Sequence, residues 1–193
     1  MNRQQHLLEL KRELRRRKAK DDFWEYCLWS DYDFFIIRQG FLKEIAEAMQ
    51  CVVEGKYKRL AVSLPPRAGK SYITSHLVAW ALGRNQSKCY MRNTHTERLA
   101  LKFSNDIKMI IKSELYISVF GKIEFVKDAA EDWTLKGATT GASYFCAGVG
   151  GNITGLGCNG IAIIDDSIKN FEEAASDTQL EKKIGRASCR ERV

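Results

Sequence analysis

The 193-residue sequence lacks the features of membrane and secreted proteins. It has no apolar run near the roughly 18 residues that a membrane-spanning helix needs. Its polar, basic N-terminus is not followed by the apolar stretch of a secretory signal, so we expect a cytoplasmic protein. The six cysteines form no CxxC pair and no zinc-spaced cluster with histidine, so we interpret them as reduced core residues. Internal repeats and low-complexity segments are absent as well.

The composition that is present is typical of a soluble globular protein, with 45% hydrophobic and 28% charged residues. The net charge of +7 suggests a nucleic-acid partner, but residues 1–20 alone hold eight Lys or Arg against two Glu. The basic character is therefore local. Residues 3–20 read as a charged helix with Leu7, Leu10 and Leu14 on one stripe. We favour a solvated or partner-packed helix over direct DNA contact.

Hydrophobic periodicity predicts helices that alternate with short strands. The helices are expected over 3–20, 23–29, 39–54, 70–82 and 96–112. Buried strands are expected over 59–64, 88–93 and 160–164, with shorter strand-like pieces within 123–149. This alternation predicts an α/β fold with a mainly parallel sheet and helices on both faces, preceded by N-terminal helices.

A phosphate-binding loop is indicated at residues 64–71, between a predicted strand and a predicted helix. Gly69, Lys70 and Ser71 match the end of the pattern GxxxxGK(S/T), while Leu64 replaces its first glycine. Backbone N–H groups and the helix dipole favour an anion at such a helix start. Lys70 would reach the β- and γ-phosphates, and the Ser71 hydroxyl would ligate Mg²⁺. The simpler alternative is a chance GKS at a turn.

A second candidate site is the acidic pair Asp165-Asp166, which follows the apolar run Ile161-Ala-Ile-Ile164. Two carboxylates at the end of a buried strand are costly unless they serve a ligand. Asp165 fits the Mg²⁺-coordinating position, and Asp166 fits the position that orients or deprotonates the attacking water. The alternative is a strand that simply turns into solvent, where Asp is common. The loop and the pair support each other, since each predicts the other.

The chain resembles the large terminase subunit of tailed bacteriophages, the ATPase that drives DNA into a prohead. The resemblance runs from about Phe23 to Lys183. It rests on PPRAGKS, on KCYMRNTHTERLALKFSNDIKMIIKS, on the glycine-rich GVGGNITGLGCNG and on IIDDSIKNFEEAAS. Two departures are Ser167, where proline is common, and Asp166, where many members have Glu.

The resemblance implies a P-loop ATPase domain over 38–183, truncated, after an N-terminal helical segment over 1–37. The nucleotide-contacting residues would be Gln39, Pro66, Arg67, Ala68, Gly69, Lys70 and Ser71, with Ser71 and Asp165 on the metal. Lys70, Arg67 and Asp166 would serve catalysis, with Arg67 near the γ-phosphate. Asn152 and Thr154 could reach nucleotide or DNA, although these glycine-rich turns need no such role.

The function implied is ATP hydrolysis with Mg²⁺ that translocates viral double-stranded DNA, in an infected or lysogenic bacterial host. The partners would be DNA, the phage portal and the small terminase subunit, with a homo-oligomeric ring and no membrane. Two other functions remain open. One is another helicase-like nucleic-acid-dependent ATPase, and the other is a non-catalytic nucleotide-binding assembly module.

The last ten residues, 184–193, read as a doubtful and non-native tail, because IGRASCRERV resembles the translation of a common sequencing adapter. The alternative is an ordinary basic tail. Terminases continue into further ATPase strands and a ribonuclease-H-like nuclease domain, neither of which is visible here. We therefore expect the 193-residue chain itself to be weak or inactive as an ATPase and to have no nuclease activity.

Overall fold

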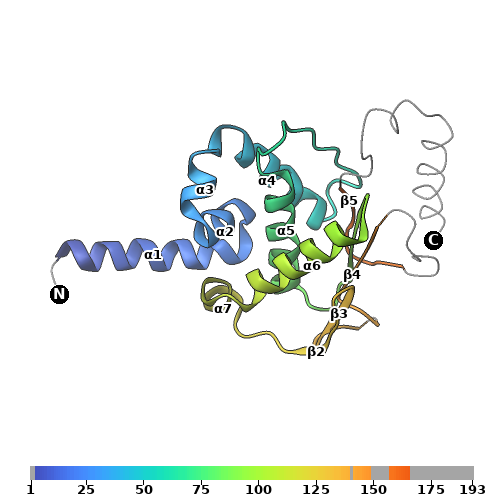
Figure 1. Cartoon of the computed structure of the whole chain (residues 1–193). Coiled ribbons are helices and arrows are strands. Elements are labelled where there is room, and N and C mark those ends of the chain that lie inside the picture. Colours follow the sequence, from blue (N-terminus) through green and yellow to red (C-terminus); the bar gives the residue numbers. More distant parts are fainter. Residues whose placement is uncertain (1–2, 140, 149–156, 166–193) are drawn as a thin grey trace.

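The computed structural model describes residues 3–139, 141–148 and 157–165 as helices packed beside one sheet (Figure 1). The helices are α1 (Arg3–Asp21), α2 (Phe23–Ser30), α3 (Tyr32–Ile36), α4 (Gln39–Val53), α5 (Lys70–Arg84), α6 (Glu97–Lys112) and α7 (Glu114–Phe120). The strands are β1 (Tyr90–Thr94), β2 (Phe125–Asp128), β3 (Asp132–Leu135), β4 (Tyr144–Gly148) and β5 (Ala162–Ile164). The predicted alternation of helices and strands is confirmed from α5 through β1 to α6, and the short helices α3 and α7 were not predicted.

The five strands form one mixed sheet in the order β2-β3-β4-β1-β5. The central strand β1 is parallel to β4 on one side and to β5 on the other. The pairs β2–β3 and β3–β4 are antiparallel. The prediction of a mainly parallel sheet is therefore wrong, because the short strands within 123–149 return as a hairpin rather than through helical crossovers. The labelled helices lie on one side of this sheet in Figure 1.

The strand predicted over 59–64 is also wrong, since this segment has no regular secondary structure and is mostly exposed. The strand predicted over 160–164 forms as β5 but is not buried, and Ile164 is 55% exposed. Within the described residues β5 is the edge strand of the sheet, and residues 59–64 do not pair with it.

Polar caps explain where several helices begin. The Asp22 carboxylate accepts from Glu25 N at the start of α2, and the Thr96 hydroxyl accepts from Leu99 N at the start of α6. Gly55 follows α4 with a φ of 76°, a left-handed backbone suited to ending a helix. The predicted helix boundaries near 23, 54 and 96 therefore follow local capping chemistry.

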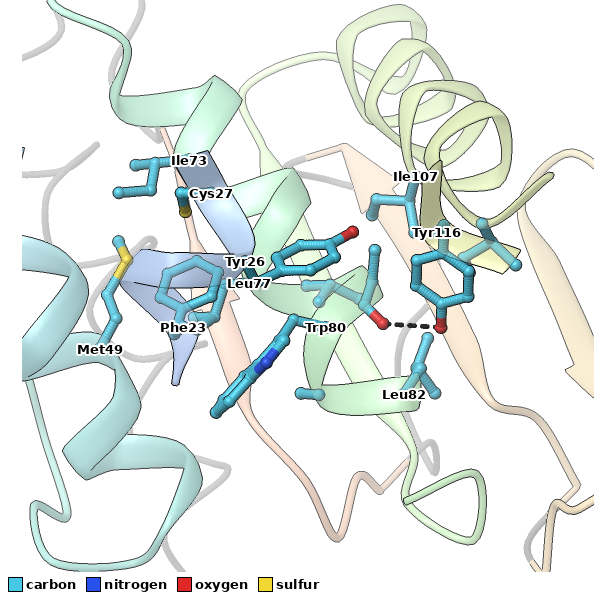
Figure 2. Close-up of a cluster of buried hydrophobic side chains, with 14 of the residues drawn as sticks. Phe23, Tyr26, Cys27, Met49, Ile73, Leu77, Trp80, Leu82, Ile107 and Tyr116 are labelled. Carbon is cyan, nitrogen blue, oxygen red and sulfur yellow. Dashed lines mark hydrogen bonds between the residues drawn. The ribbon is translucent and has the colours of Figure 1, made fainter. Parts of the chain in front are cut away.

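The hydrophobic core lies around α5, whose residues from 73 to 82 are all buried. Trp80 on this helix meets the ring of Phe23 at 5.3 Å, and its indole N–H donates to Ala19 O at 3.1 Å. On the other side, the Tyr116 hydroxyl donates to Ala79 O at 2.9 Å (Figure 2). The N-terminal helices and α7 thus pack on the same helix, α5.

On α1, Leu7, Leu10 and Leu14 are each more than half exposed, which leaves the predicted solvated or partner-packed role of this helix a prediction. No helix in the described ranges combines the length and apolar character that crossing a membrane requires. None of the five described cysteines is in a disulfide bond; Cys27, Cys89 and Cys146 are buried, Cys51 and Cys158 are half-buried, and Cys189 lies outside the described residues.

The buried His76 should make stability depend on pH. Burial lowers the pKa of His76 to about 4, below its ordinary value of 6.5, despite a hydrogen-bonding contact of 3.0 Å between Nδ1 and Tyr72 O. Between these two values the unfolded chain binds more protons, so the free energy of unfolding falls as the pH is lowered. From pH 7.5 to pH 5 the loss due to His76 should be about 2 kcal/mol.

Urea unfolding of His76→Asn at the two pH values measures this contribution, because Asn keeps an N–H donor and does not titrate. The pH-dependent loss of stability should shrink by about 2 kcal/mol. His6→Asn, on the exposed side of α1, is the control and should leave the loss unchanged. An identical pH dependence in wild type and His76→Asn would contradict the assignment.

Candidate functional site

The predicted phosphate-binding loop leads directly into α5, which begins at Lys70. Gly69 precedes this helix with a φ of 101°, and Arg67 also has a positive φ, of 65°. Between them, the Ala68 N–H donates to Pro65 O at 3.2 Å. The loop therefore turns tightly before the helix, and the N–H groups at the start of a helix favour an anion.

The loop rests on the helices α3 and α4. A methyl group added at Gly69 would lie 2.7 Å from the Phe34 ring and 3.7 Å from Leu42 Cδ1. One turn further along α5, the Tyr72 hydroxyl donates to Asp31 Oδ2 at 2.8 Å, and its ring lies 4.5 Å from that of Phe34. The loop and the first turn of α5 thus pack against the N-terminal helices α3 and α4.

The acidic strand end lies beside the loop. Asp165 follows β5, and its backbone N–H donates to Asn93 O at the end of β1, 2.8 Å away. Its side chain is only 4% exposed. The strands β1 and β5 run parallel, so their carboxyl ends meet at the same edge of the sheet, where open α/β sheets bind their ligands.

Asp165 is held between two cations. Lys70 Nζ lies 3.3 Å from Asp165 Oδ1, and Arg92 donates to Asp165 Oδ2 at 2.5 Å. Burial by itself raises the pKa of Asp165, but the hydrogen bond and charge of Arg92, the Ser71 hydrogen bond and the Lys70 charge outweigh it and hold this pKa below its usual value. The carboxylate is therefore ionised and oriented at neutral pH.

A cavity of about 570 Å³ opens beside this ion cluster. Leu60 and Val62, from the segment predicted as a strand, line this cavity, as do Ile161 and Ile163 at the β5 edge. Lys70 and Asp165 also line this cavity. The volume is in the range of small-molecule sites, and the lining mixes apolar side chains with charged ones.

The remaining predicted residues occupy less defined positions. Arg67 is exposed and has no hydrogen bond or ion pair with another described residue; Pro66 is exposed and Ala68 half-buried. Gln39 is the exposed first residue of α4, in the stretch between Phe34 and Leu42, the two residues that face Gly69. Asp166, Asn152 and Thr154 lie outside the described residues, so their predicted roles remain predictions.

The residues present fit a magnesium-bound triphosphate. Hydroxyl and carboxylate oxygens are the ligands Mg²⁺ prefers, and Ser71 and Asp165 bring one of each together. Mg²⁺ at nucleotide sites takes only one or two protein ligands, with water and phosphate completing its shell. The described ranges contain no group of three His, Cys, Asp or Glu side chains able to hold a metal.

Arg92 is the site residue that sequence reasoning missed. It lies on the strand predicted over 88–93, where a charged side chain in a buried strand is itself a signal, because it requires a partner of opposite charge. The sequence could not identify that partner, since β1 and β5 come from distant parts of the chain.

Substitution of Gly69 by Ala should destabilise the protein through two separable effects. The left-handed backbone costs an L-residue about 1 kcal/mol, and the new methyl group would overlap the Phe34 ring. Gly55→Ala, with a φ of 76° and no heavy atom within 4 Å, isolates the backbone cost. We expect Gly69→Ala to lower the free energy of unfolding by about 2 kcal/mol more than Gly55→Ala does in urea titrations.

Gly40→Ala is the second control, because Gly40 lies in α4 with no positive φ and no atom within 4 Å of the added methyl group. This change should be neutral or raise the free energy of unfolding by up to about 1 kcal/mol, the helix preference of Ala over Gly. If Gly69→Ala lowered the free energy of unfolding no more than Gly55→Ala does, this result would contradict the close packing of the loop on α3.

Comparison of the chain with protein-family models, with curated protein sequences and with solved structures found no match.

Proposed function

We propose that this chain is the ATPase part of a large terminase subunit of tailed bacteriophages, which hydrolyses ATP to move viral double-stranded DNA into a prohead. The observation that carries the proposal is the 3.3 Å contact between Lys70 Nζ and Asp165 Oδ1. Sequence reasoning assigned these two residues to one nucleotide site, although they are far apart in the chain. The resemblance of PPRAGKS and IIDDSIKNFEEAAS to terminase motifs supports the choice of family.

A P-loop NTPase architecture is part of this proposal. Three features support it: the left-handed Gly69 before α5, the parallel pairing of β1 with β4 and β5, and the position of Asp165 just beyond β5. The helix start supplies N–H groups to the phosphates, and the strand end supplies a carboxylate to the metal.

Each site residue has a distinct role in this proposal. Lys70 binds the β- and γ-phosphates, and its side chain is one-third exposed. Ser71 and Asp165 hold Mg²⁺, which neutralises charge that develops on the phosphates. Asp166 orients the attacking water, and Arg67 contacts the γ-phosphate from the exposed side of the loop.

The partners follow from the proposed family rather than from the contacts in this chain. They are double-stranded DNA, the phage portal and the small terminase subunit, with several copies of the chain in a ring and the whole in the cytoplasm of the bacterial host. Gln39, exposed at the start of α4, is proposed to contact adenine.

Lys70→Ala tests the proposal most simply. Removal of the cation at the phosphates should weaken ATP binding in Mg²⁺ at least tenfold and abolish hydrolysis in the protein that carries this chain. Equilibrium binding of a fluorescent ATP analogue measures the first effect, and phosphate release measures the second. Lys102→Ala, an exposed lysine of α6, is the matched control and should change neither.

Asp166→Asn separates hydrolysis from binding. It should keep Mg²⁺-dependent ATP binding within a fewfold of wild type and lose turnover, because only the group that orients the water is changed. ATP binding without turnover in the wild-type protein would instead favour a non-catalytic assembly module. Equal ATP affinity in wild type and a folded Lys70→Ala would refute the nucleotide site itself.

A further inference from the structure

Arg92 lies at the centre of β1, and its side chain is fully buried. Its guanidinium carbon lies 3.6 Å from the centre of the Phe103 ring on α6. One terminal nitrogen donates to Ser75 Oγ at 2.9 Å, and the other donates to Asp165 Oδ2 at 2.5 Å and to Ser71 O at 3.3 Å. Its Nε has no hydrogen-bond partner among the described residues. A buried cation with an unsatisfied N–H is costly, so its retention here needs a reason.

The reason lies in the charge balance of the site. Among the described residues, the two cations Lys70 and Arg92 face one carboxylate, Asp165, and oppose the binding of a further cation to it. Because each carboxylate oxygen already contacts one of the cations, a metal ion must compete with both of them for Asp165.

The two cations differ in their freedom to move. The Lys70 side chain is 33% exposed and can turn toward an incoming phosphate, which frees Oδ1 of Asp165. Arg92 is 0% exposed, and its guanidinium is enclosed between Phe103 and Ser75, so it stays on Oδ2. Arrival of the phosphates thus removes one competitor and adds negative charge, while Arg92 keeps the carboxylate in place.

We propose that Arg92 is a positioning residue that makes metal binding conditional on nucleotide. In the nucleotide-free protein it neutralises Asp165 and keeps Mg²⁺ away, so the metal enters together with the triphosphate. In the loaded site it holds the carboxylate in the orientation that the metal needs. This inference rests on the proposed function, and it gives a role to Arg92 of β1, to which the motif resemblance assigned none.

The test is the affinity for Mn²⁺ alone, measured from the electron paramagnetic resonance signal of free Mn²⁺ without nucleotide. Arg92→Met removes the charge, so its Mn²⁺ affinity should be at least tenfold tighter than that of wild type. Arg92→Lys keeps the charge and should bind Mn²⁺ as weakly as wild type. ATP should tighten Mn²⁺ binding strongly in wild type and several-fold less in Arg92→Met.

Lys108→Met is the matched control, because Lys108 is also a nearly buried cation but pairs with Asp128, away from Asp165. It should leave Mn²⁺ affinity unchanged. If Arg92→Met does not fold, Phe103→Leu loosens the guanidinium without removing a charge and should tighten Mn²⁺ binding at least threefold. A folded Arg92→Met, or in its place a folded Phe103→Leu, with wild-type or weaker Mn²⁺ affinity would overturn the inference.

The outcomes separate this inference from the function on which it rests. If Lys70→Ala and wild type bind ATP equally, the nucleotide site is wrong whatever Mn²⁺ does. If wild type binds ATP with Mg²⁺ through Lys70 but Arg92→Met leaves Mn²⁺ affinity unchanged, the nucleotide site stands and only the role of Arg92 fails.

Discussion

The buried carboxylate of Asp165 joins the two halves of the candidate site. It ties the start of α5, through Lys70, to the edge of the sheet, and it neutralises the Arg92 side chain within β1. Removing one partner of such a buried pair leaves an uncompensated charge, which costs on the order of 3–5 kcal/mol. The positions of the loop, the central strand and the edge strand therefore depend on this one group.

The N-terminal helices matter to the site because they support the loop that carries Lys70. Phe34 packs against Gly69, and Asp31 caps α3 while accepting the Tyr72 hydroxyl on α5. The core around Trp80 then fixes α5 against α2. The first turn of α5 is thus constrained both by the sheet and by helices that precede it in the chain, which is the preorganisation that a phosphate site requires.

Local signals predicted the elements that depend on neighbouring residues. Hydrophobic periodicity located α5 and α6, and the motif around Gly69 and Lys70 located the loop. The predictions from the sequence failed where the structure depends on pairing between distant segments of the chain. The apolar run 59–64 reads as a buried strand, yet it lines a cavity without a ladder partner, and Arg92 reads as an ordinary strand residue until Asp165 is placed beside it.

The central claim is that Lys70 and Asp165 belong to one nucleotide site, and a double-mutant cycle on ATP affinity in Mg²⁺ tests it most directly. Lys70→Ala and Asp165→Asn are measured singly and together by isothermal titration, with folding checked by circular dichroism. If the two residues act on one bound ligand, each single change weakens ATP binding. The fold loss of ATP affinity in the double variant is then at least tenfold smaller than the product of the two single fold losses. Strictly multiplicative losses, or an unchanged affinity in either folded single variant, would contradict the account.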